Sequence, residues 1–350
     1  MHLYASVYFK PYDLKKGFYV LLYRIDITLM NKKGGILMAV NMKGRSILSL
    51  MDNTSEEIRY LLDIAKQVKA ESRAGIRHQR FVGKTLALIF EKRSTRTRLA
   101  FETAFAEEGG HPIFLSIQDI QLGAKESVED TARVLGRMVD AIEFRGFKQE
   151  TVETLAKYSG VPVYNGLTDL FHPTQVLADL QTIEEEFGRL KGIKMVFMGD
   201  GRNNMANSLM VGAAKMGMHY VICSPESLRP EKWLVDECMK FAQESGAKIE
   251  FTANPDEAVK NADVIYTDVW ASMGEEDKAA ERRKLLQPYQ VNEELMRKTG
   301  KPETIFMHCL PAVKGEEVTF EVIEGKQSRV WDEAENRKHT IKAIMIATLL

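Results

Sequence analysis

The stretch TLALIF (residues 85–90) runs directly into EKRSTRTR (residues 91–98), and this junction decides the fold. Residues 85–90 carry no charge and are almost entirely apolar, which is typical of a strand buried on both faces of a parallel sheet. Residues 91–98 are basic and rich in hydroxyl groups, and a helical pattern follows over Leu99–Glu108 until Gly109-Gly110 ends it. We therefore expect a strand, a polar turn and a helix in this order.

The same alternation continues on both sides of this junction. Thr54 and Glu57 have the spacing of a capping box, and Ile58, Leu61, Leu62 and Ala65 follow at helical spacing. The pattern predicts further strands at 114–116, 141–145, 162–165, 194–198, 220–223, 248–252, 264–267 and 305–308. It predicts further helices at 127–138, 151–158, 175–187, 204–216, 231–244 and 333–350. Such alternation indicates an α/β protein with two doubly wound parallel-sheet domains joined by helices.

The basic turn after the first of these strands is a candidate anion site. Where a strand leads into a helix, backbone N–H groups and the helix dipole converge on a bound phosphate. Ser94, Thr95 and Thr97 add hydroxyl donors, and Arg96 offers a planar fork of N–H groups to phosphoryl oxygens. In the alternative interpretation Ser94 only caps the helix and the arginines are solvated.

Composition limits the classes of partner. Lys plus Arg (48) nearly balances Asp plus Glu (49), so no overall field favours nucleic acid or anionic lipid. The three cysteines, Cys223, Cys238 and Cys309, show no CxxC spacing, which argues against a disulfide framework or a zinc site. A reducing, cytoplasmic location fits this pattern, and no apolar run has the length of a membrane span.

Residues 1–37 differ from the rest of the chain. Aromatic residues crowd the first 23 positions without helical or strand periodicity, and Lys32-Lys33-Gly34-Gly35 stands shortly before Met38. Codons for Lys-Lys-Gly-Gly can form a purine-rich run like a ribosome-binding site. Our hypothesis is that Met38 is the start and that residues 1–37 are a translated leader; a genuine N-terminal arm is the alternative.

Several blocks in this order resemble the aspartate and ornithine carbamoyltransferase superfamily. STRTR (94–98) is similar to its phosphate-binding signature. The other blocks are FRG (144–146), HPTQ (172–175), DVWASMG (268–274), HCLP (308–311) and DEAENR (332–337). The DxxxSMG and HCLP blocks resemble the ornithine branch rather than the aspartate or putrescine branches. The resemblance covers the chain from about residue 42 to residue 350.

The resemblance implies a carbamoyl phosphate-binding domain at 38–183, an ornithine-binding domain at 184–332 and a terminal helix at 333–350 that packs back on the first domain. The implied activity is carbamoyl transfer from carbamoyl phosphate to the δ-amine of L-ornithine, giving citrulline and phosphate in arginine metabolism. No cofactor and no metal is required, and direct attack gains rate from orientation and preorganised charge. A homotrimer or a multiple of trimers is implied.

Roles for individual residues follow from the resemblance. Ser94, Thr95, Arg96 and Thr97 would form the phosphate cradle, with Arg337 completing the positive surround and Gln121 lent to a neighbouring subunit. Arg145 and His172 would polarise the carbamoyl carbonyl group, and Gln175 would accept from the carbamoyl NH2 group. The implied ornithine set is Asn204, Asp268, Ser272, Met273 and Cys309, and the Leu310 carbonyl group would lie where the δ-amine enters. No single general base is implied.

Two other classes of function compete with this interpretation. A nicotinamide-dependent oxidoreductase is suggested by Gly199-Asp200-Gly201 after a strand, but Asn204 stands where a GxGxxG motif needs its third glycine. A catalytically silent relative is the second alternative, and against it the polar positions of the blocks are all kept. His308 beside Cys309 also invites a metal or Cys/His nucleophile hypothesis, but no further ligands stand at a suitable spacing.

Overall fold

The computed structural model describes residues 40–118, 120–122, 125–271 and 279–350. The leader hypothesis for residues 1–37 and the predicted roles of Ser272 and Met273 fall outside these residues. Residues 42–350 form one compact unit.

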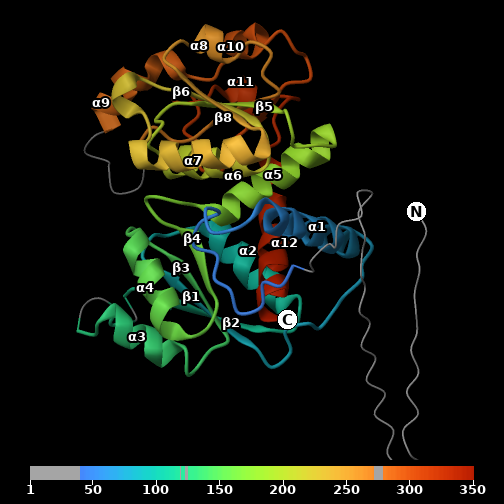
Figure 1. The fold of residues 1–350 in the computed structure, drawn as a ribbon, viewed down its shortest axis with the longest axis vertical. Coiled ribbons are helices and arrows are strands. Elements are labelled where there is room, and N and C mark those ends of the chain that lie inside the picture. The colour runs from blue at the N-terminus through green and yellow to red at the C-terminus, as the bar shows by residue number, and fades with distance from the viewer. Residues whose placement is uncertain (1–39, 119, 123–124, 272–278) are drawn as a thin grey trace, which may run out of the picture. The chain divides into compact units, whose positions relative to one another are not determined.

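The first half of this unit is built on a parallel sheet of four strands in the order β2-β1-β3-β4 (Figure 1). The strands are β1 (Thr85–Phe90), β2 (His111–Ser116), β3 (Ala141–Arg145) and β4 (Val163–Leu167). The helices of this half are α1 (Ser55–Arg73), α2 (Thr95–Ala106), α3 (Val128–Leu135) and α4 (Gln149–Ser159). The two faces of the sheet are covered by different helices. Ile89, Ile142 and Phe144 form a core cluster with α3 and α4 residues, whereas Phe101 of α2 stacks on Tyr164 on the other face.

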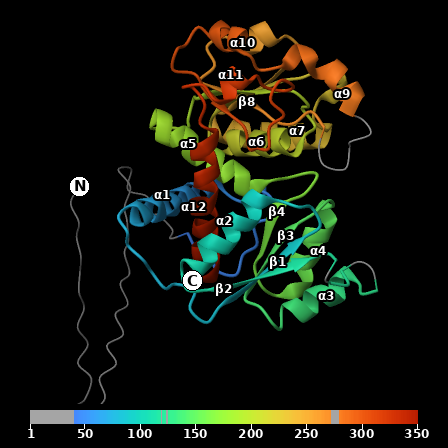
Figure 2. The same cartoon turned by 180° about the vertical axis from the view of Figure 1, so that it is seen from behind.

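The second half contains a parallel sheet of five strands in the order β7-β6-β5-β8-β9. The strands are β5 (Lys194–Met198), β6 (His219–Cys223), β7 (Lys248–Thr252), β8 (Val264–Thr267) and β9 (Ile305–Met307). The helices are α6 (Asn204–Lys215), α7 (Lys232–Ser245), α8 (Pro255–Ala258), α9 (Ala279–Leu286), α10 (Glu293–Lys298) and α11 (Phe320–Ile323). The helices α6 and α7 lie along one side of this sheet and α8, α10 and α11 along the other (Figures 1 and 2). The prediction of two doubly wound parallel sheets is confirmed.

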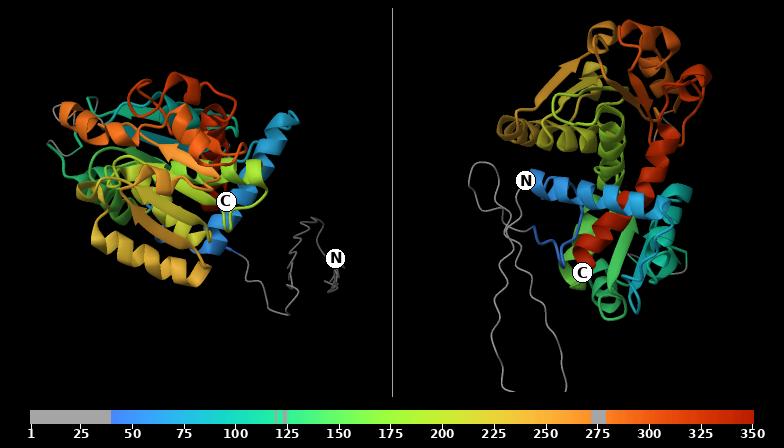
Figure 3. Two further views of the ribbon diagram at one scale, coloured as in Figure 1. Left: turned by 90° about the horizontal axis from the view of Figure 1, so that it is seen from above. Right: turned by 90° about the vertical axis from the view of Figure 1, so that its right-hand side faces the viewer.

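Two long helices connect the halves. The helix α5 (Pro173–Phe187) follows β4 and contacts both α1 and α6. A Cβ atom added at Gly212 would lie 2.6 Å from a methyl group of Val176, so glycine lets α5 and α6 approach closely. The last helix, α12 (Val330–Leu349), packs on α1, α2 and α5, as the side view in Figure 3 shows. The last helix therefore lies against helices of the first half.

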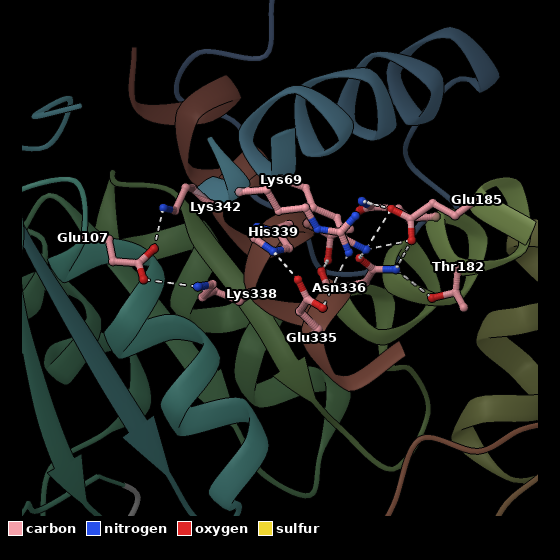
Figure 4. Close-up of polar contacts among 12 residues, drawn as sticks. Lys69, Glu107, Thr182, Glu185, Glu335, Asn336, Lys338, His339 and Lys342 are labelled. Atoms are coloured by element: carbon pink, nitrogen blue, oxygen red, sulfur yellow. Dashed lines mark hydrogen bonds and ion pairs between the residues drawn. The ribbon is translucent and has the colours of Figure 1, made fainter. Parts of the chain in front are cut away.

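Buried polar contacts anchor α12 to its neighbours (Figure 4). Lys69 Nζ of α1 donates to Glu185 Oε2 of α5 at 2.8 Å and to Asn336 Oδ1 of α12 at 2.7 Å. Asn336 Nδ2 in turn donates to Thr182 Oγ1 of α5 at 2.9 Å. On the other side of α12, Lys338 and Lys342 both contact the Glu107 carboxylate. These contacts fix the rotation of α12 about its own axis.

Several predicted boundaries are wrong. The helix expected at 99–108 begins earlier, at Thr95, because Ser94 caps it by accepting from the Thr97 N–H group. No element was predicted at 279–286, but these residues form α9, and Arg282 is buried against Asp200 at 2.7 Å. His339, on α12, is buried. Within the described ranges, no helix combines the length and apolar character needed to cross a membrane.

Candidate active site

The first group of candidate residues lies at the carboxyl end of the first sheet, where the chain reverses its winding direction. The strand order places β1 beside both β2 and β3, so the switch point lies between β1 and β3. Ligands of open α/β sheets bind at such points because the loops there diverge and leave a crevice. Ser94 caps α2 directly after β1, and Arg145 ends β3. The N-terminus of α2 and the carboxyl end of β3 therefore lie together at this switch point.

Thr97 holds two arginines together at this point. Its Oγ1 accepts from Arg145 Nη1 at 3.3 Å and from Arg337 Nη2 at 3.2 Å. Arg337 Nη1 also donates to Gln175 Oε1 at 2.7 Å. All four side chains are buried. Residues from β3 and α12 thus converge on one hydroxyl group of α2, although they lie up to 240 positions apart in the sequence, and Gln175 of α5 joins the cluster through Arg337.

The arginine cluster is only partly balanced by nearby acids, since Glu143 acts on Arg145 and Asp179 on Arg337. Burial, and for Arg145 also the neighbouring Arg337, lowers the pKa of both guanidinium groups to about 10. Burial likewise lowers the pKa of Arg96, which is half-buried at the start of α2. All three remain protonated at neutral pH. The Nε atoms of Arg145 and Arg337 have no hydrogen-bond partner among the described residues. Crowded, incompletely paired cations of this kind favour binding of an anion.

The interpretation in which Ser94 only caps a helix surrounded by solvated arginines holds in part. Ser94 does cap α2, and Arg93 and Arg98 are exposed, with Arg98 paired to Glu102. Arg96 is half-buried, however, and Arg145 and Arg337 are buried. A capping role alone does not explain three desolvated cations at one helix N-terminus.

His172 stands beside the same cluster, at the N-terminal end of α5. Its backbone N–H donates to Ser208 Oγ of α6 at 2.8 Å. Burial and the charges of Arg337, Arg145 and Arg96 lower the pKa of His172 well below its ordinary value. The imidazole is therefore neutral at neutral pH and can donate one hydrogen bond without adding a further positive charge.

The second group of candidate residues lies at the carboxyl end of the second sheet. Its switch point falls between β5 and β8, because β5 pairs with β6 on one side and β8 on the other. Asp268 follows β8, and Asn203 caps α6 after the turn that follows β5. Asn203 Nδ2 donates to Asp268 Oδ2 at 2.9 Å. The neighbouring Asn204 donates its amide to the Thr168 carbonyl oxygen at 2.8 Å, which uses one of its two N–H groups.

Cys309 joins this second group from the end of β9. Its Sγ donates to Asp268 Oδ1 at 3.3 Å. Burial and the charges of Asp268, Glu333 and Asp179 raise the pKa of the Cys309 thiol well above its ordinary value. Cys309 is consequently a neutral thiol at neutral pH, so it can orient a group but does not act as a thiolate.

Leu310 adopts a positive φ of 59°, which is unfavourable for a branched side chain. The conformation is supported by a hydrogen bond of 2.8 Å from Leu310 N to His308 Nδ1. His308 Nε2 in turn lies 3.3 Å from Glu317 Oε1, and because Nδ1 accepts, Nε2 carries the proton. The turn that presents Cys309 is thus held by a buried histidine.

Asp268, His308 and Cys309 are the one group of possible metal ligands that converges within the described ranges, with atoms inside 4.8 Å of one another. Both ring nitrogens of His308 already take part in hydrogen bonds. A metal ion would have to break one of these bonds to gain a nitrogen ligand. These three side chains are therefore better suited to the hydrogen bonds that they make with protein groups than to binding a metal ion.

The two groups face each other across the connection between the halves. The negative charge of Asp268 acts on Arg96 and favours its protonated form. Thr95 and Gln121 are exposed, and Gln121 lies on the loop between β2 and α3. Of the predicted site residues that the structure describes, all but Gln121 belong to one of the two groups or to the start of α2.

Several residues of the site were missed by sequence reasoning. Asn203 orients Asp268, and the buried acids Asp179 and Glu333 both accept from Gln175 Nε2 at 2.8 Å. Glu143, on β3 beside Arg145, is also fully buried. Glu333 lies inside the DEAENR block, so the sequence analysis could have identified it. Asp179 and Glu143 carry no signal in the sequence, because an isolated acid on a helix or strand is usually exposed.

The fold and the site together define a two-domain α/β protein with a candidate anion site at the N-terminus of α2. The carbamoyl-P binding domain of aspartate/ornithine carbamoyltransferases matches residues 45–185, and the Asp/Orn binding domain matches residues 191–348. The chain belongs to this family, and within it to the ornithine carbamoyltransferases.

Individual relatives support this assignment. The ornithine carbamoyltransferase of Pseudothermotoga lettingae is 77% identical over 313 residues, which cover 89% of this chain and 100% of the relative. That of Thermotoga maritima is 74% identical over the same coverage. Among solved structures, the ornithine carbamoyltransferase from Pyrococcus furiosus has 50% identity and a TM-score of 0.86, covering 89% of this chain and 99% of that chain.

Proposed function

We propose that this protein transfers the carbamoyl group of carbamoyl phosphate to the δ-amine of L-ornithine, producing L-citrulline and phosphate in arginine metabolism. The observation that carries the proposal is the set of three desolvated arginines around Thr97, facing Asp268 and Cys309. A dianionic donor satisfies the first group, and an acceptor with ammonium groups satisfies the second. The relatives that are 77% and 76% identical to this chain are ornithine carbamoyltransferases, which supports the same activity.

On the donor side, we assign the phosphate to the N-terminus of α2, with Ser94, Thr95, Arg96 and Thr97 as its cradle and Arg337 closing the positive surround. Arg145 and His172 would donate to the carbamoyl oxygen, where negative charge grows as the amine attacks. A neutral His172 suits this role, since it adds a donor without deepening the repulsion among the arginines. Gln175 Oε1 would accept from the carbamoyl NH2 group.

On the acceptor side, Asp268 would bind the α-ammonium group of ornithine, and the remaining N–H of Asn204 its carboxylate. Cys309 and the Leu310 carbonyl oxygen would orient the δ-amine, and we extend the acceptor set to Ser272 and Met273 on the strength of the family resemblance. The amine attacks the carbamoyl carbon, the bond from that carbon to the phosphate oxygen breaks, and phosphate leaves. The amine must first lose a proton, because the pKa of a free alkylamine is about 10.

The domain assignments follow from the same proposal. Residues 38–183 would bind carbamoyl phosphate, residues 184–332 ornithine, and residues 333–350 return to the first domain. The three cysteines are all free, and two of them are buried, which supports a reducing, cytoplasmic location.

We also infer a homotrimer or a multiple of trimers. Its support is three exposed apolar side chains: Val82 before β1, Leu99 on α2 and Ile113 on the edge strand β2, exposed by 65%, 56% and 37%. Exposed apolar groups at a sheet edge favour association. Gln121, exposed on the loop after β2, would reach a neighbouring phosphate site. Light scattering on the purified protein tests the assembly, and a monomer with full activity would contradict it.

One assay tests the proposed activity. The purified chain should form citrulline from carbamoyl phosphate and ornithine without added nucleotide, and it should prefer ornithine to putrescine and aspartate as acceptor. A nicotinamide-dependent oxidoreductase or a silent relative would form none. A preference for another acceptor would show that the acceptor pocket is assigned wrongly.

A further inference from the structure

The amide of Gln175 is held in one orientation by two buried carboxyl groups. Its Nε2 donates to Asp179 Oδ1 and to Glu333 Oε1, each at 2.8 Å, while its Oε1 accepts from Arg337 Nη1 at 2.7 Å. Both N–H groups are therefore used, and one lone pair of Oε1 remains. The reversed amide would place its oxygen against two carboxyl groups and its NH2 group against a guanidinium. The orientation observed is the one that electrostatics allows.

The two carboxyl groups are themselves firmly placed. Glu333 Oε1 also accepts from Tyr266 Oη at 3.1 Å, and Glu333 Oε2 accepts from the His308 backbone N–H at 3.1 Å. Asp179 lies one helical turn after Gln175 on α5, the spacing at which side chains on a helix meet. Glu333 sits on α12, whose rotation is fixed by the contacts of Lys69 and Asn336 shown in Figure 4.

The pair does not carry two full negative charges. Both side chains are fully buried. Burial raises the pKa of Asp179 to about 7, and burial together with the charge of Asp179 raises that of Glu333 well above its ordinary value. Asp179 Oδ2 has no hydrogen-bond partner among the described residues, so it is a suitable place for a shared proton. A singly protonated pair still offers an acceptor to each N–H of Gln175.

We propose that Asp179 and Glu333 are positioning residues, which keep the free lone pair of Gln175 Oε1 directed at the donor substrate and so make the site select a carbamoyl group over an acetyl group. This inference rests on the proposed function. The NH2 of a carbamoyl group donates to the oriented oxygen, whereas the methyl group of acetyl phosphate, of nearly the same size, leaves a buried acceptor unpaired. Sites built to hydrogen-bond a substrate group discriminate strongly against analogues that lack it.

The readout is a selectivity ratio: the inhibition constant of acetyl phosphate divided by the KM of carbamoyl phosphate, both from initial rates at saturating ornithine. In Asp179→Leu the acceptor for one N–H of Gln175 is lost, and the ratio should fall about tenfold. Asp179→Asn, whose amide oxygen can replace the carboxyl oxygen, should keep the ratio within about twofold. Gln181→Leu, a similar change at another buried position of α5, is the matched control and should also keep it.

A double-variant comparison separates positioning from a general loss of packing. In a Gln175→Met background the oriented oxygen is absent, so adding Asp179→Leu should leave the selectivity ratio unchanged. An equal tenfold fall in both backgrounds, or an unchanged ratio in the single variant, would overturn the inference. If Asp179→Leu does not fold, Glu333→Gln serves instead. In Glu333→Gln a single carbonyl oxygen faces the three groups that donate to Glu333, from Gln175, Tyr266 and His308, so this variant should also lower the selectivity ratio. An unchanged ratio would again overturn the inference. Absence of citrulline with the wild-type protein would refute the proposed function, whereas an active wild type with unaffected variants would refute this inference alone.

Discussion

Replacement of Thr97 by valine should weaken use of carbamoyl phosphate without affecting use of ornithine. Valine keeps the shape of threonine but removes the hydroxyl that accepts from Arg145 Nη1 at 3.3 Å and from Arg337 Nη2 at 3.2 Å. Thr97 is 1% exposed, so water does not easily replace that oxygen. Both guanidinium groups would then lose their common acceptor while still repelling each other.

The expected size of the effect follows from these two contacts. A hydrogen bond to a charged group contributes about 1.5–3 kcal/mol. Both contacts are long for their type, so we take the lower value for each and expect a loss of about 3 kcal/mol in binding of the donor. Since about 1.4 kcal/mol corresponds to a factor of ten, kcat/KM for carbamoyl phosphate should fall roughly 100-fold.

Initial rates with each substrate varied at saturating concentration of the other provide the test. Thr97→Ser restores the hydroxyl and should recover most of the activity, and Thr103→Val, further along α2, controls for the effect of valine on the helix. Thermal unfolding of each variant shows whether the fold is kept. A KM for carbamoyl phosphate within about twofold of wild type in folded Thr97→Val would refute the idea that this hydroxyl holds the arginines in place.

Three further outcomes are expected. Asp268→Asn should raise the KM of ornithine at least about tenfold and leave that of carbamoyl phosphate nearly unchanged; equal effects on both would make Asp268 structural. Burial lowers the pKa of His339 from 6.5 to about 4. As the pH falls, this histidine is therefore protonated in the unfolded chain before it is in the folded protein, and the stability of the fold decreases from about pH 6.5 to about pH 4. The loss of unfolding free energy is up to about 3 kcal/mol. The urea midpoint of His339→Gln should therefore vary less with pH than that of His111→Gln, a control at an exposed histidine. Parallel curves of midpoint against pH for the two variants would exclude this contribution of His339. Asn336→Leu should cost about 2–4 kcal/mol of unfolding free energy, because Lys69 and Glu185 lose a buried partner. A denaturant midpoint equal to wild type would contradict that network.

The strands were predictable because a buried strand of a parallel sheet is a short, continuous apolar run. The bounds of β1, β3, β5, β7 and β8 agree with those predicted. The start of α2 was missed because residues 95–98 show no apolar period, and only the cap at Ser94 marks the first turn. The short helices α8, α10 and α11 were missed for a related reason, since four to six residues are too few to show a period.

The site was predictable where its residues stand together in sequence and not where they meet only in space. The turn from Ser94 to Arg98 contains its own hydroxyl and guanidinium groups, so its chemistry can be read locally. The contact between Thr97 and Arg337 joins residues 240 positions apart, and only the family resemblance suggested it. The buried acids Asp179 and Glu333 were missed because polar residues on a helix normally mark its solvent face, whereas α12 is buried on nearly all sides.

The position of α12 explains how two separate switch points act on one reaction. Each doubly wound sheet places its polar residues at its own carboxyl edge, and nothing in either sheet determines the distance between the two edges. Arg337 of α12 contacts Thr97 and Gln175 on the donor side, and Glu333, one turn earlier, accepts from the backbone N–H of His308, next to Cys309. Side chains four positions apart on a helix are separated by only about 5–6 Å at their Cβ atoms. A single helical turn therefore sets the spacing between the group that holds the carbamoyl donor and the strand that presents the amine-orienting thiol.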